Sequence, residues 1–244
     1  DIEMATPEGY AASSWEKGYG DYVMKPDLTT LRRVPWLEGT ALVLCDIIDH
    51  HTHAPVPHAP RQMLKTQMAR AKAMGFTPMM ATELEFFLFA HSFDDIRRGG
   101  FRDLEPISGY NEDYNILQTT REEHVMRPIR NLLVEAGVPV ENTKGEAETG
   151  QEELNIRYGD GLAAADHHTI AKQAVKEIAN AKGHAASFMA KWHHSKVGSA
   201  AHIHQSLFKG KTNALAVDLG GPSDWTLQCA ADAFENGKRV RRSP

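Results

Sequence analysis

Cysteine is scarce in this chain of 244 residues. Its two cysteines, Cys45 and Cys229, lie far apart, and neither has a second cysteine at the spacing of a metal site. This pattern excludes a disulfide-stapled scaffold and a cysteine-based zinc site. Such cysteine usage is typical of a protein in a reducing compartment, so we expect a cytoplasmic location.

Long hydrophobic runs are absent as well. No apolar stretch approaches the roughly 20 residues of a membrane span, so the sequence indicates no membrane partner. Positive charge is not in excess, because 27 basic and 32 acidic residues give a net charge of −5 and the basic residues are dispersed. This distribution lacks the basic patch of a nucleic-acid-binding protein, and any phosphate binding has to be local.

The composition is otherwise that of an ordinary globular protein, with 41% hydrophobic and 24% charged residues. The length suits one large domain, or one domain with a fragment of another. Because the sequence starts at Asp1 rather than at a methionine, we expect it to be a piece of a longer product.

A stretch that reads AAHIHQSL is typical of a β-strand. Alternate side chains of a strand share one face, so His202, His204 and Ser206 point together, whereas Ile203 and Leu207 are expected to pack inward. One face of this strand therefore carries a row of potential ligands.

Two further stretches supply carboxylates. The stretch TELEFFLF places Glu83 and Glu85 on one face of a predicted strand, and GEAETGQEEL brings Glu146 and Glu153 to the head of another. A sheet that carries these side chains beside a histidine has the ligands for hard divalent cations. Carboxylate-rich sites suit magnesium or manganese, and a single imidazole leans toward manganese.

The hydrophobic pattern predicts an α+β fold with a sheet open on one face. Pro60 is typical of a first helical position, and Thr120 with Glu123 reads as a capping box at the start of another helix. Residues 93–118 are expected to form a long surface excursion. Strands are predicted at 22–24, 41–46, 83–89, 153–158, 187–192 and 202–207, and helices at 60–74, 120–136 and 166–182.

Two groups of histidines are interpreted as solvated rather than metal-binding. Those in the proline-rich loop lack the regular spacing of a defined metal site, and those beside Trp192 suit a surface turn. The first group is His50, His51, His53 and His58, and the second is His193 and His194.

Taken together and in this order, the motifs resemble the catalytic domain of the glutamine synthetase family. The resemblance covers about residues 17–208, and its motifs lie at 83–87, 146, 150–153, 164–166, 187–191, 198–199 and 202–207. Residues 20–27 and 35–36 resemble the end of the family's small N-terminal β-grasp domain. The resemblance implies that residues 1–58 are the end of that domain with a linker, and that residues 59–244 are a partial catalytic domain with a mainly antiparallel sheet and helices on one face.

The resemblance also implies an ATP-dependent ligase that joins glutamate to ammonia or another amine through a γ-glutamyl phosphate. Glu85, Glu146 and Glu153 match ligands of a Mg²⁺ or Mn²⁺ ion near glutamate. Glu83 and His202 match ligands of a second ion on the ATP phosphates.

Three further positions match the family's binding residues. His204 and Ser206 lie on the nucleotide side, and Gly198 lies in the loop beside the glutamate backbone. Glu148 and Glu152 fall outside the pattern of ligands and are expected at the surface. The family usually assembles as stacked rings, so the resemblance implies a dodecamer-like homo-oligomer for the full-length parent.

Some positions depart from the family's pattern. Val197 stands where many glutamine synthetases have an asparagine, and Ala200 with Ala201 replaces a Gly-Met pair. These changes resemble the branch of the family that glutamylates other amines, such as polyamines, so the identity of the amine stays open.

Other family features have no counterpart in the sequence. The aspartate-bearing loop, the later arginines and the last ligand of the ATP-side metal are missing, and residues 222–244 do not resemble the family's continuation. We therefore expect the chain as written to be a poor catalyst. The alternatives are a catalytically silent member that keeps metal or nucleotide binding and, less favoured, a metallohydrolase that uses the same carboxylates.

Overall fold

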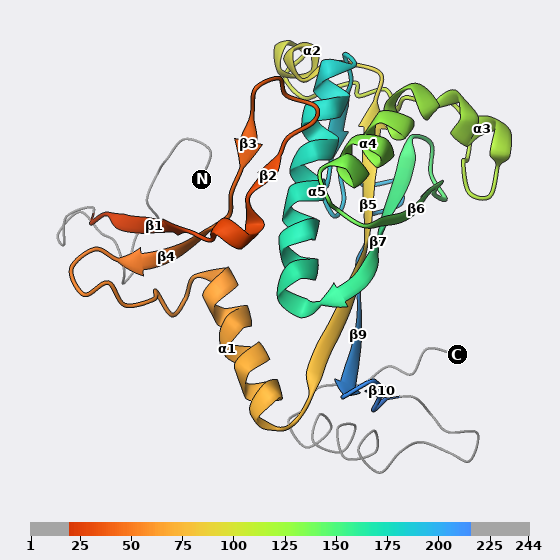
Figure 1. Cartoon of the computed structure of the whole chain (residues 1–244). Helices are drawn as coiled ribbons and strands as arrows, with labels where there is room; N and C mark the ends of the chain where they lie inside the picture. Colours follow the sequence, from red (N-terminus) through yellow and green to blue (C-terminus); the bar gives the residue numbers. More distant parts are fainter. Residues whose placement is uncertain (1–19, 216–244) are drawn as a thin grey trace, which may run out of the picture.

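A six-stranded antiparallel sheet forms the centre of the structure, a computed structural model that describes residues 20–215. Its strands run in the order β10, β9, β5, β7, β6, with β8 paired to β5 next to the end of β9 (Figure 1). The predictions for residues 1–19 and for the tail at 222–244 concern residues outside the described range. The strands are β5 (Thr77–Phe89), β6 (Val140–Gly145), β7 (Gln151–Asp160), β8 (Ala185–Ser187), β9 (Ala201–Lys209) and β10 (Thr212–Asn213).

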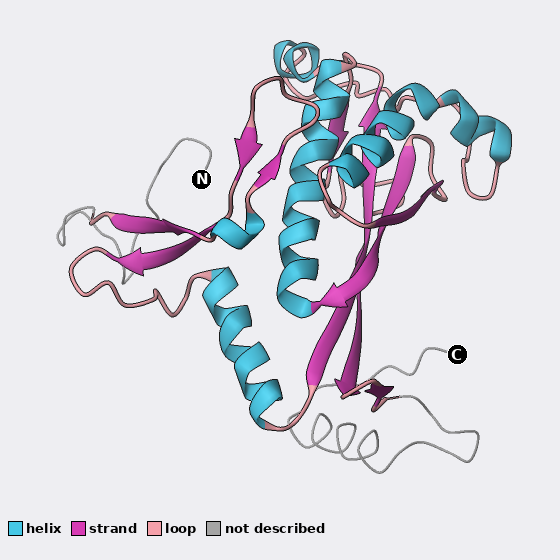
Figure 2. Ribbon diagram, viewed as in Figure 1, coloured by secondary structure: helices cyan, strands magenta, loops and turns pink. Residues whose placement is uncertain are grey.

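Strand β5 separates an apolar face from a polar face. Leu84 and Phe86 are buried on one side, whereas Glu83 and Glu85 are half-buried on the other. The apolar side is covered by α4 (Glu123–Glu135) and α5 (Gly161–Ala181), as Figure 2 shows. The predicted α+β arrangement with a sheet open on one face is therefore confirmed.

Helix α5 packs on the sheet through two adjacent rows of small and branched side chains. All six side chains are buried because residues three and four apart share one face of a helix. They are Ile170, Ala174 and Ile178 in one row, and Ala171, Val175 and Ala179 in the other.

The N-terminal part consists of two small two-stranded sheets that lie beside the main sheet. Strand β1 (Tyr22–Pro26) pairs with β4 (Cys45–Asp49), and β2 (Arg32–Arg33) pairs with β3 (Ala41–Leu42); a 3₁₀ turn, η2 (Leu28–Thr30), and α1 (Pro60–Ala73) complete this part. Arg61 on α1 forms ion pairs with Asp27, Asp46 and Asp166 at 2.8, 2.7 and 3.0 Å. This guanidinium joins both the β1–β4 sheet and α1 to α5.

Three predicted elements differ from the structure. The apolar run at 41–46 is divided between two strands, the whole of β3 and the start of β4, because β3 and β4 pair with different partners. The strand predicted at 187–192 stops at Ser187, since its pairing with β5 covers only the last three residues of β5. In β9, Ile203 is 69% exposed rather than packed, and only Leu207 is buried.

The predicted capping box at Thr120 is wrong. Thr120 lies inside α3 (Ile116–Arg121), which is capped by Asn115 through a hydrogen bond from the Gln118 amide. Helix α4 then follows after Glu122 without a side-chain cap. The predicted surface excursion at 93–118 is confirmed as irregular for the most part, but it contains α2 (Phe93–Arg98) and the start of α3.

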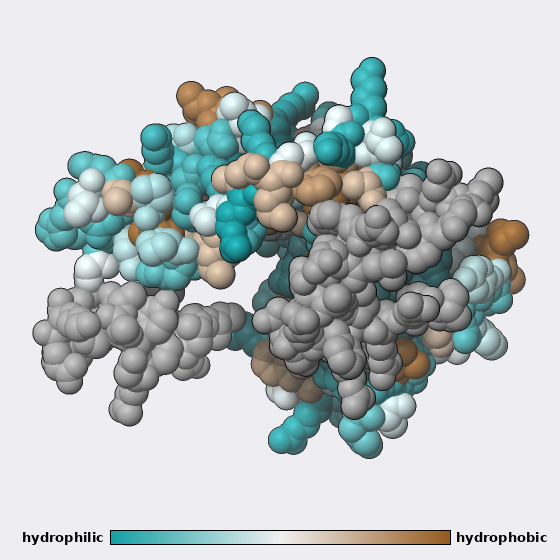
Figure 3. All heavy atoms as spheres, turned by 90° about the horizontal axis from the view of Figure 1, so that it is seen from below, coloured by the Kyte–Doolittle hydropathy of each residue, from teal (hydrophilic) through white to brown (hydrophobic). Residues whose placement is uncertain are grey.

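In the view of Figure 3 the described surface is mainly hydrophilic, and its apolar residues form small scattered patches. None of the helices within residues 20–215 has both the length and the apolar character to cross a membrane.

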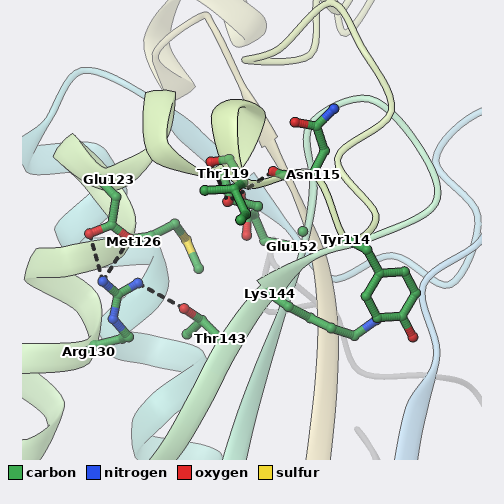
Figure 4. A pocket seen from close by; sticks show the side chains of 11 residues that line it. Tyr114, Asn115, Thr119, Glu123, Met126, Arg130, Thr143, Lys144 and Glu152 are labelled. Atoms are coloured by element: carbon green, nitrogen blue, oxygen red, sulfur yellow. Dashed lines mark hydrogen bonds and ion pairs between the residues drawn. The ribbon is translucent and has the colours of Figure 1, made fainter.

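A cluster of three buried carboxylates lies on the helix-covered side of β7. Glu152, which the sequence placed at the surface, is 2% exposed and lies near Glu112 and Glu122. Glu112 accepts hydrogen bonds from the Ser108 hydroxyl and from the Gly150 amide. Glu152 also borders a cavity of about 250 Å³ between α3, α4 and β6 (Figure 4).

Burial and the charge of Glu112 keep protons on Glu122 and Glu152. Burial first, and then the charge of Glu112, raise the pKa of Glu122 to about 7. The same two causes raise the pKa of Glu152 well above its ordinary value. The fold therefore favours the neutral form of these side chains.

We expect the stability of the fold to fall as the pH rises from about 4.5 to about 7. Unfolded Glu122 ionises near 4.5, whereas the folded side chain keeps its proton until about 7, so ionisation favours the unfolded chain in this window. Gln is neutral at every pH, so in the Glu122→Gln variant the free energy of unfolding should decrease less between about pH 5 and about pH 8. Urea unfolding at these two pH values measures the difference.

The matched control is Glu135→Gln, at an exposed position at the end of the same helix. It should keep the pH dependence of the unaltered protein. An equal pH dependence in both variants would contradict the assignment of Glu122.

Candidate active site

The open face of the sheet carries two rows of polar side chains, and each row takes one residue from each of three neighbouring strands. In the first row, Glu83 on β5 pairs with His202 on β9 and with Asn155 on β7. In the second row, Glu85 pairs with Glu153 on β7, and that residue pairs with Lys144 on β6. Directly opposite residues have Cβ atoms about 4.5–5.5 Å apart, so the side chains of each row are in reach of one another.

All five residues predicted as metal ligands are brought together in two groups. The ligand atoms of Glu83, Glu153 and His202 lie within 4.8 Å of one another, and so do those of Glu85, Glu146 and Glu153. Glu153 belongs to both groups. The arrangement places two potential cation positions side by side with one carboxylate between them.

Glu83 lies between two imidazoles of β9. Its Oε2 atom is 3.2 Å from Nδ1 of His202, and its Oε1 atom is 3.0 Å from Nε2 of His204. Both imidazoles are more than half exposed. His204 is therefore joined to the metal-ligand group as well as to the predicted nucleotide side.

Glu153 is the most deeply buried carboxylate of these two groups, at 5% exposed. Burial, with the charges of Glu146 and Glu83, raises the pKa of Glu153, although the Asn155 amide and Lys144 act in the opposite direction. A divalent cation between the two groups would relieve this unfavourable interaction.

Lys144 is the cation that the chain itself supplies at this face. Its Nζ atom is 2.5 Å from Oε1 of Glu146 and 3.6 Å from Oδ1 of Asp113. Burial lowers the pKa of Lys144, but the contact with Glu146 outweighs this effect and holds the pKa above its ordinary value. Sequence reasoning missed Lys144, although the alternation of β6 places it opposite Glu153.

Gln151 connects the carboxylates to the loop that contains Gly198. Its side-chain amide donates to Oε2 of Glu85 at 2.9 Å and to the carbonyl of Gly198 at 3.1 Å. The backbone amide of Ala200 donates to the same oxygen of Glu85 at 2.9 Å. Gln151 is 1% exposed, so both partners are held by a fixed side chain.

Gly198 occupies a position that no larger residue fits. A Cβ atom there would lie 2.5 Å from the carbonyl oxygen of Ala190, a contact with backbone that cannot turn away. The loop therefore needs glycine at this position for steric reasons.

The sequence placed Glu148 at the surface, but in the structure this carboxylate has partners in the loop that contains Gly198. Its Oε1 atom accepts from Nζ of Lys196 at 3.0 Å, and its Oε2 atom accepts from the amide of Val197 at 3.4 Å. Burial raises the pKa of Glu148, but these hydrogen bonds outweigh it and lower the pKa overall. Glu148 is thus a second anchor of the loop that contains Gly198.

Two adjoining cavities extend from Glu83 along β9. One of about 400 Å³ is lined by Glu83, Asn155, Tyr158, His204 and Ser206 among others. The other, of about 290 Å³, is lined by Tyr158, His204 and Ser206 as well. The hydroxyl of Ser206 accepts a long hydrogen bond of 3.4 Å from the side chain of Asn213.

Tyr158 lines both cavities and was missed by the sequence analysis. Strict alternation assigns it to the apolar face of β7 with Leu154 and Ile156. The register between β5 and β7 shifts between Met80 and Thr82, opposite this segment, and interrupts the alternation there.

Comparisons with known proteins agree with this geometry. Residues 57–235 match the family "Glutamine synthetase, catalytic domain". The chain is 42% identical to a γ-glutamylethanolamide synthetase of Streptomyces coelicolor over 224 residues, which are 92% of this chain and 48% of that protein. It is 37% identical to a glutamate–isopropylamine ligase of Pseudomonas over 85% of this chain and 45% of that protein.

Solved structures show the same relationship. A GmaS/ADP complex superposes with a TM-score of 0.73 at 28% identity, over 83% of this chain and 46% of that chain. A glutamine synthase homologue at 22% identity has a TM-score of 0.76 and shares the fold. The chain spans about half the length of the curated relatives it matches. On the strength of the matched domain and of these identities, the chain belongs to the glutamine synthetase family.

Proposed function

We propose that the protein joins glutamate to ammonia or another small amine with ATP as the energy source, through a γ-glutamyl phosphate. The observation that carries this proposal is the pair of ligand groups that share Glu153 on the open face of the sheet. Membership of the glutamine synthetase family supports the reaction class.

The donor set fits Mg²⁺ or Mn²⁺. Glu85, Glu146 and Glu153 would hold one ion near glutamate, and Glu83 with His202 would hold the other near the phosphates of ATP. When bound, such ions neutralise phosphate oxygens and orient the groups for in-line transfer.

The side chains around these ligands have positioning roles. Gln151 fixes Glu85 relative to Gly198, so a cation held by Glu85 would keep a constant position relative to the loop that contains Gly198. His204 and Ser206 line the cavities on the other side of Glu83, where we place the nucleotide. The known ADP complex of a relative supports a nucleotide substrate.

For the second substrate we propose a primary alkylamine rather than ammonia alone. The named relatives act on ethanolamine and isopropylamine. Val197, in place of an amide side chain, gives the loop an apolar group that is 46% exposed and able to contact an alkyl chain.

The remaining proposals concern the protein as a whole. We place the boundary between the β-grasp part and the catalytic domain near residue 58, in the segment before α1. We further propose a ring-shaped homo-oligomer in the cytoplasm. The proposals on assembly and location rest on the family resemblance and on cysteine usage.

The test is ADP release by the purified protein with Mg²⁺ or Mn²⁺, glutamate and a panel of amines, with mass detection of the product. The panel contains ammonium, ethanolamine, isopropylamine and polyamines. Since we expect this chain to be a poor catalyst, a γ-glutamylamide should form at a low rate, and only when both glutamate and an amine are present. Phosphate release without glutamate would identify a metallohydrolase instead. A folded protein that binds manganese and nucleotide but forms no product would instead be a catalytically silent member of the family.

We also expect the affinity for Mn²⁺ to fall as the pH is lowered through the raised pKa of Glu153, because protons compete with the cation for this carboxylate. Titration of Mn²⁺ followed by electron paramagnetic resonance between about pH 8 and about pH 4, which is below the ordinary pKa of a glutamate, measures this effect. An affinity that is constant over this range would show that Glu153 is not a ligand.

The Gly198→Ala variant should raise the KM for glutamate by about tenfold to 100-fold, because the added methyl group displaces the loop from the carbonyl of Ala190. The affinity for Mn²⁺ should change much less. The matched control is Gly159→Ala, where a Cβ atom meets nothing within 4 Å. Equal KM values for the two variants would show that the loop does not contribute to glutamate binding.

A further inference from the structure

Two histidines from separate elements face each other on the side of the sheet that the helices cover. His124 lies in the first turn of α4, and His184 lies in the turn between α5 and β8. Their Nε2 atoms are 3.2 Å apart, and the rings meet edge to face at 69°. Helices α4 and α5 contact each other beside the sheet (Figure 1).

The hydrogen bonds of the other ring nitrogens fix the tautomers. Nδ1 of His124 is 3.1 Å from the carbonyl oxygen of Arg121, and Nδ1 of His184 is 3.1 Å from the carbonyl oxygen of Phe89. A carbonyl oxygen only accepts, so each Nδ1 atom carries the proton. In the neutral imidazoles both Nε2 lone pairs then point at each other.

Two lone pairs at this distance repel each other unless a cation or a proton lies between them. We propose that this pair binds an imidazole-preferring divalent transition metal ion of the Zn²⁺ class through both Nε2 atoms. Bonds of about 2.0–2.1 Å at a tetrahedral angle place two nitrogen ligands about 3.3–3.4 Å apart. The observed separation of 3.2 Å needs almost no adjustment.

The backbone carbonyls complete the arrangement. Histidines that bind metals almost always donate their second N–H group to a carbonyl or carboxylate, which fixes the ring and raises its basicity. Both histidines do so here. Within residues 20–215, no third histidine, cysteine or carboxylate joins the pair within 4.8 Å, so water would fill the remaining coordination positions of a bound ion.

This site is separate from the candidate active site in place and in chemistry. The carboxylate groups lie on the open face, whereas the histidine pair lies at the junction of α4, the α5–β8 turn and the end of β5. Nitrogen ligands favour Zn²⁺, Ni²⁺ or Cu²⁺, and carboxylates favour Mg²⁺ or Mn²⁺. The ion would join three elements and stabilise the packing of the helices on the sheet.

The test is a calorimetric titration of the whole chain with ZnCl₂ in saturating MgCl₂. We expect His124→Gln and His184→Gln to bind one Zn²⁺ fewer per chain, or to bind it at least about tenfold more weakly. The control His193→Gln alters an exposed histidine of the turn after β8 and should bind as the unaltered chain does. An equal stoichiometry in His124→Gln and the control would overturn the proposal.

A second measurement does not depend on variants. The Nε2 signals of both histidines, observed by nitrogen NMR at constant pH, should shift on addition of Zn²⁺, and the melting temperature should rise with Zn²⁺ concentration. Signals that respond to pH but not to Zn²⁺ would show that the pair shares a proton only, and would overturn the metal site. Both results are independent of ligase activity.

Discussion

The two-residue alternation of β5 is the constraint on which the fold and the site both depend. Leu84 and Phe86 fill the core under α4 and α5, and the residues between them carry the carboxylates. A slip of one residue would place Glu83 and Glu85 in the core and the apolar side chains in water. Each such apolar side chain contributes about 1.5–3 kcal/mol by burial, and each buried unpaired carboxylate costs several kcal/mol. The packing of the core therefore also orients the site.

The same alternation places neighbouring acidic side chains of β7 on opposite faces of the sheet, where repulsion between carboxylates is reduced in different ways. Glu153 points to the open face, where Lys144 reduces the repulsion from within the chain and a divalent cation can remove the rest. Its neighbour Glu152 points to the helices, where it lies beside Glu112 and Glu122 and is kept neutral by burial. One side of the strand is built for cations, and the other retains protons.

The sequence predicted those features that depend on local alternation. Glu83, Glu85 and His202 were placed on one face because strand periodicity is a property of the chain alone. The sequence did not predict the exposure of Ile203, because alternation determines which face a side chain is on but not whether another element covers that face. The burial of Glu152 involves Glu112 and Glu122, which lie 40 and 30 residues earlier in the chain, a separation at which periodicity carries no information.

Competition between local signals accounts for the misplaced helix start. Thr120 and Glu123 have the residue types and the spacing of a capping box. Asn115 caps a helix one turn earlier, and the hydroxyl of Thr120 instead donates to the carbonyl of Ile116 within that helix. The two candidate caps lie within six residues of each other, and the structure uses the one at Asn115.

Besides the ion pair between Lys196 and Glu148, three contacts to backbone atoms hold the loop that contains Gly198. Glu148 binds the amide of Val197, Gln151 binds the carbonyl of Gly198, and Glu85 binds the amide of Ala200. None of these contacts uses the side chain of the loop residue. A side chain at position 197 can therefore change from an amide to an aliphatic group while the loop keeps its place beside the carboxylates. This separation gives a physical reason why one catalytic sheet can serve ligases that use different amines.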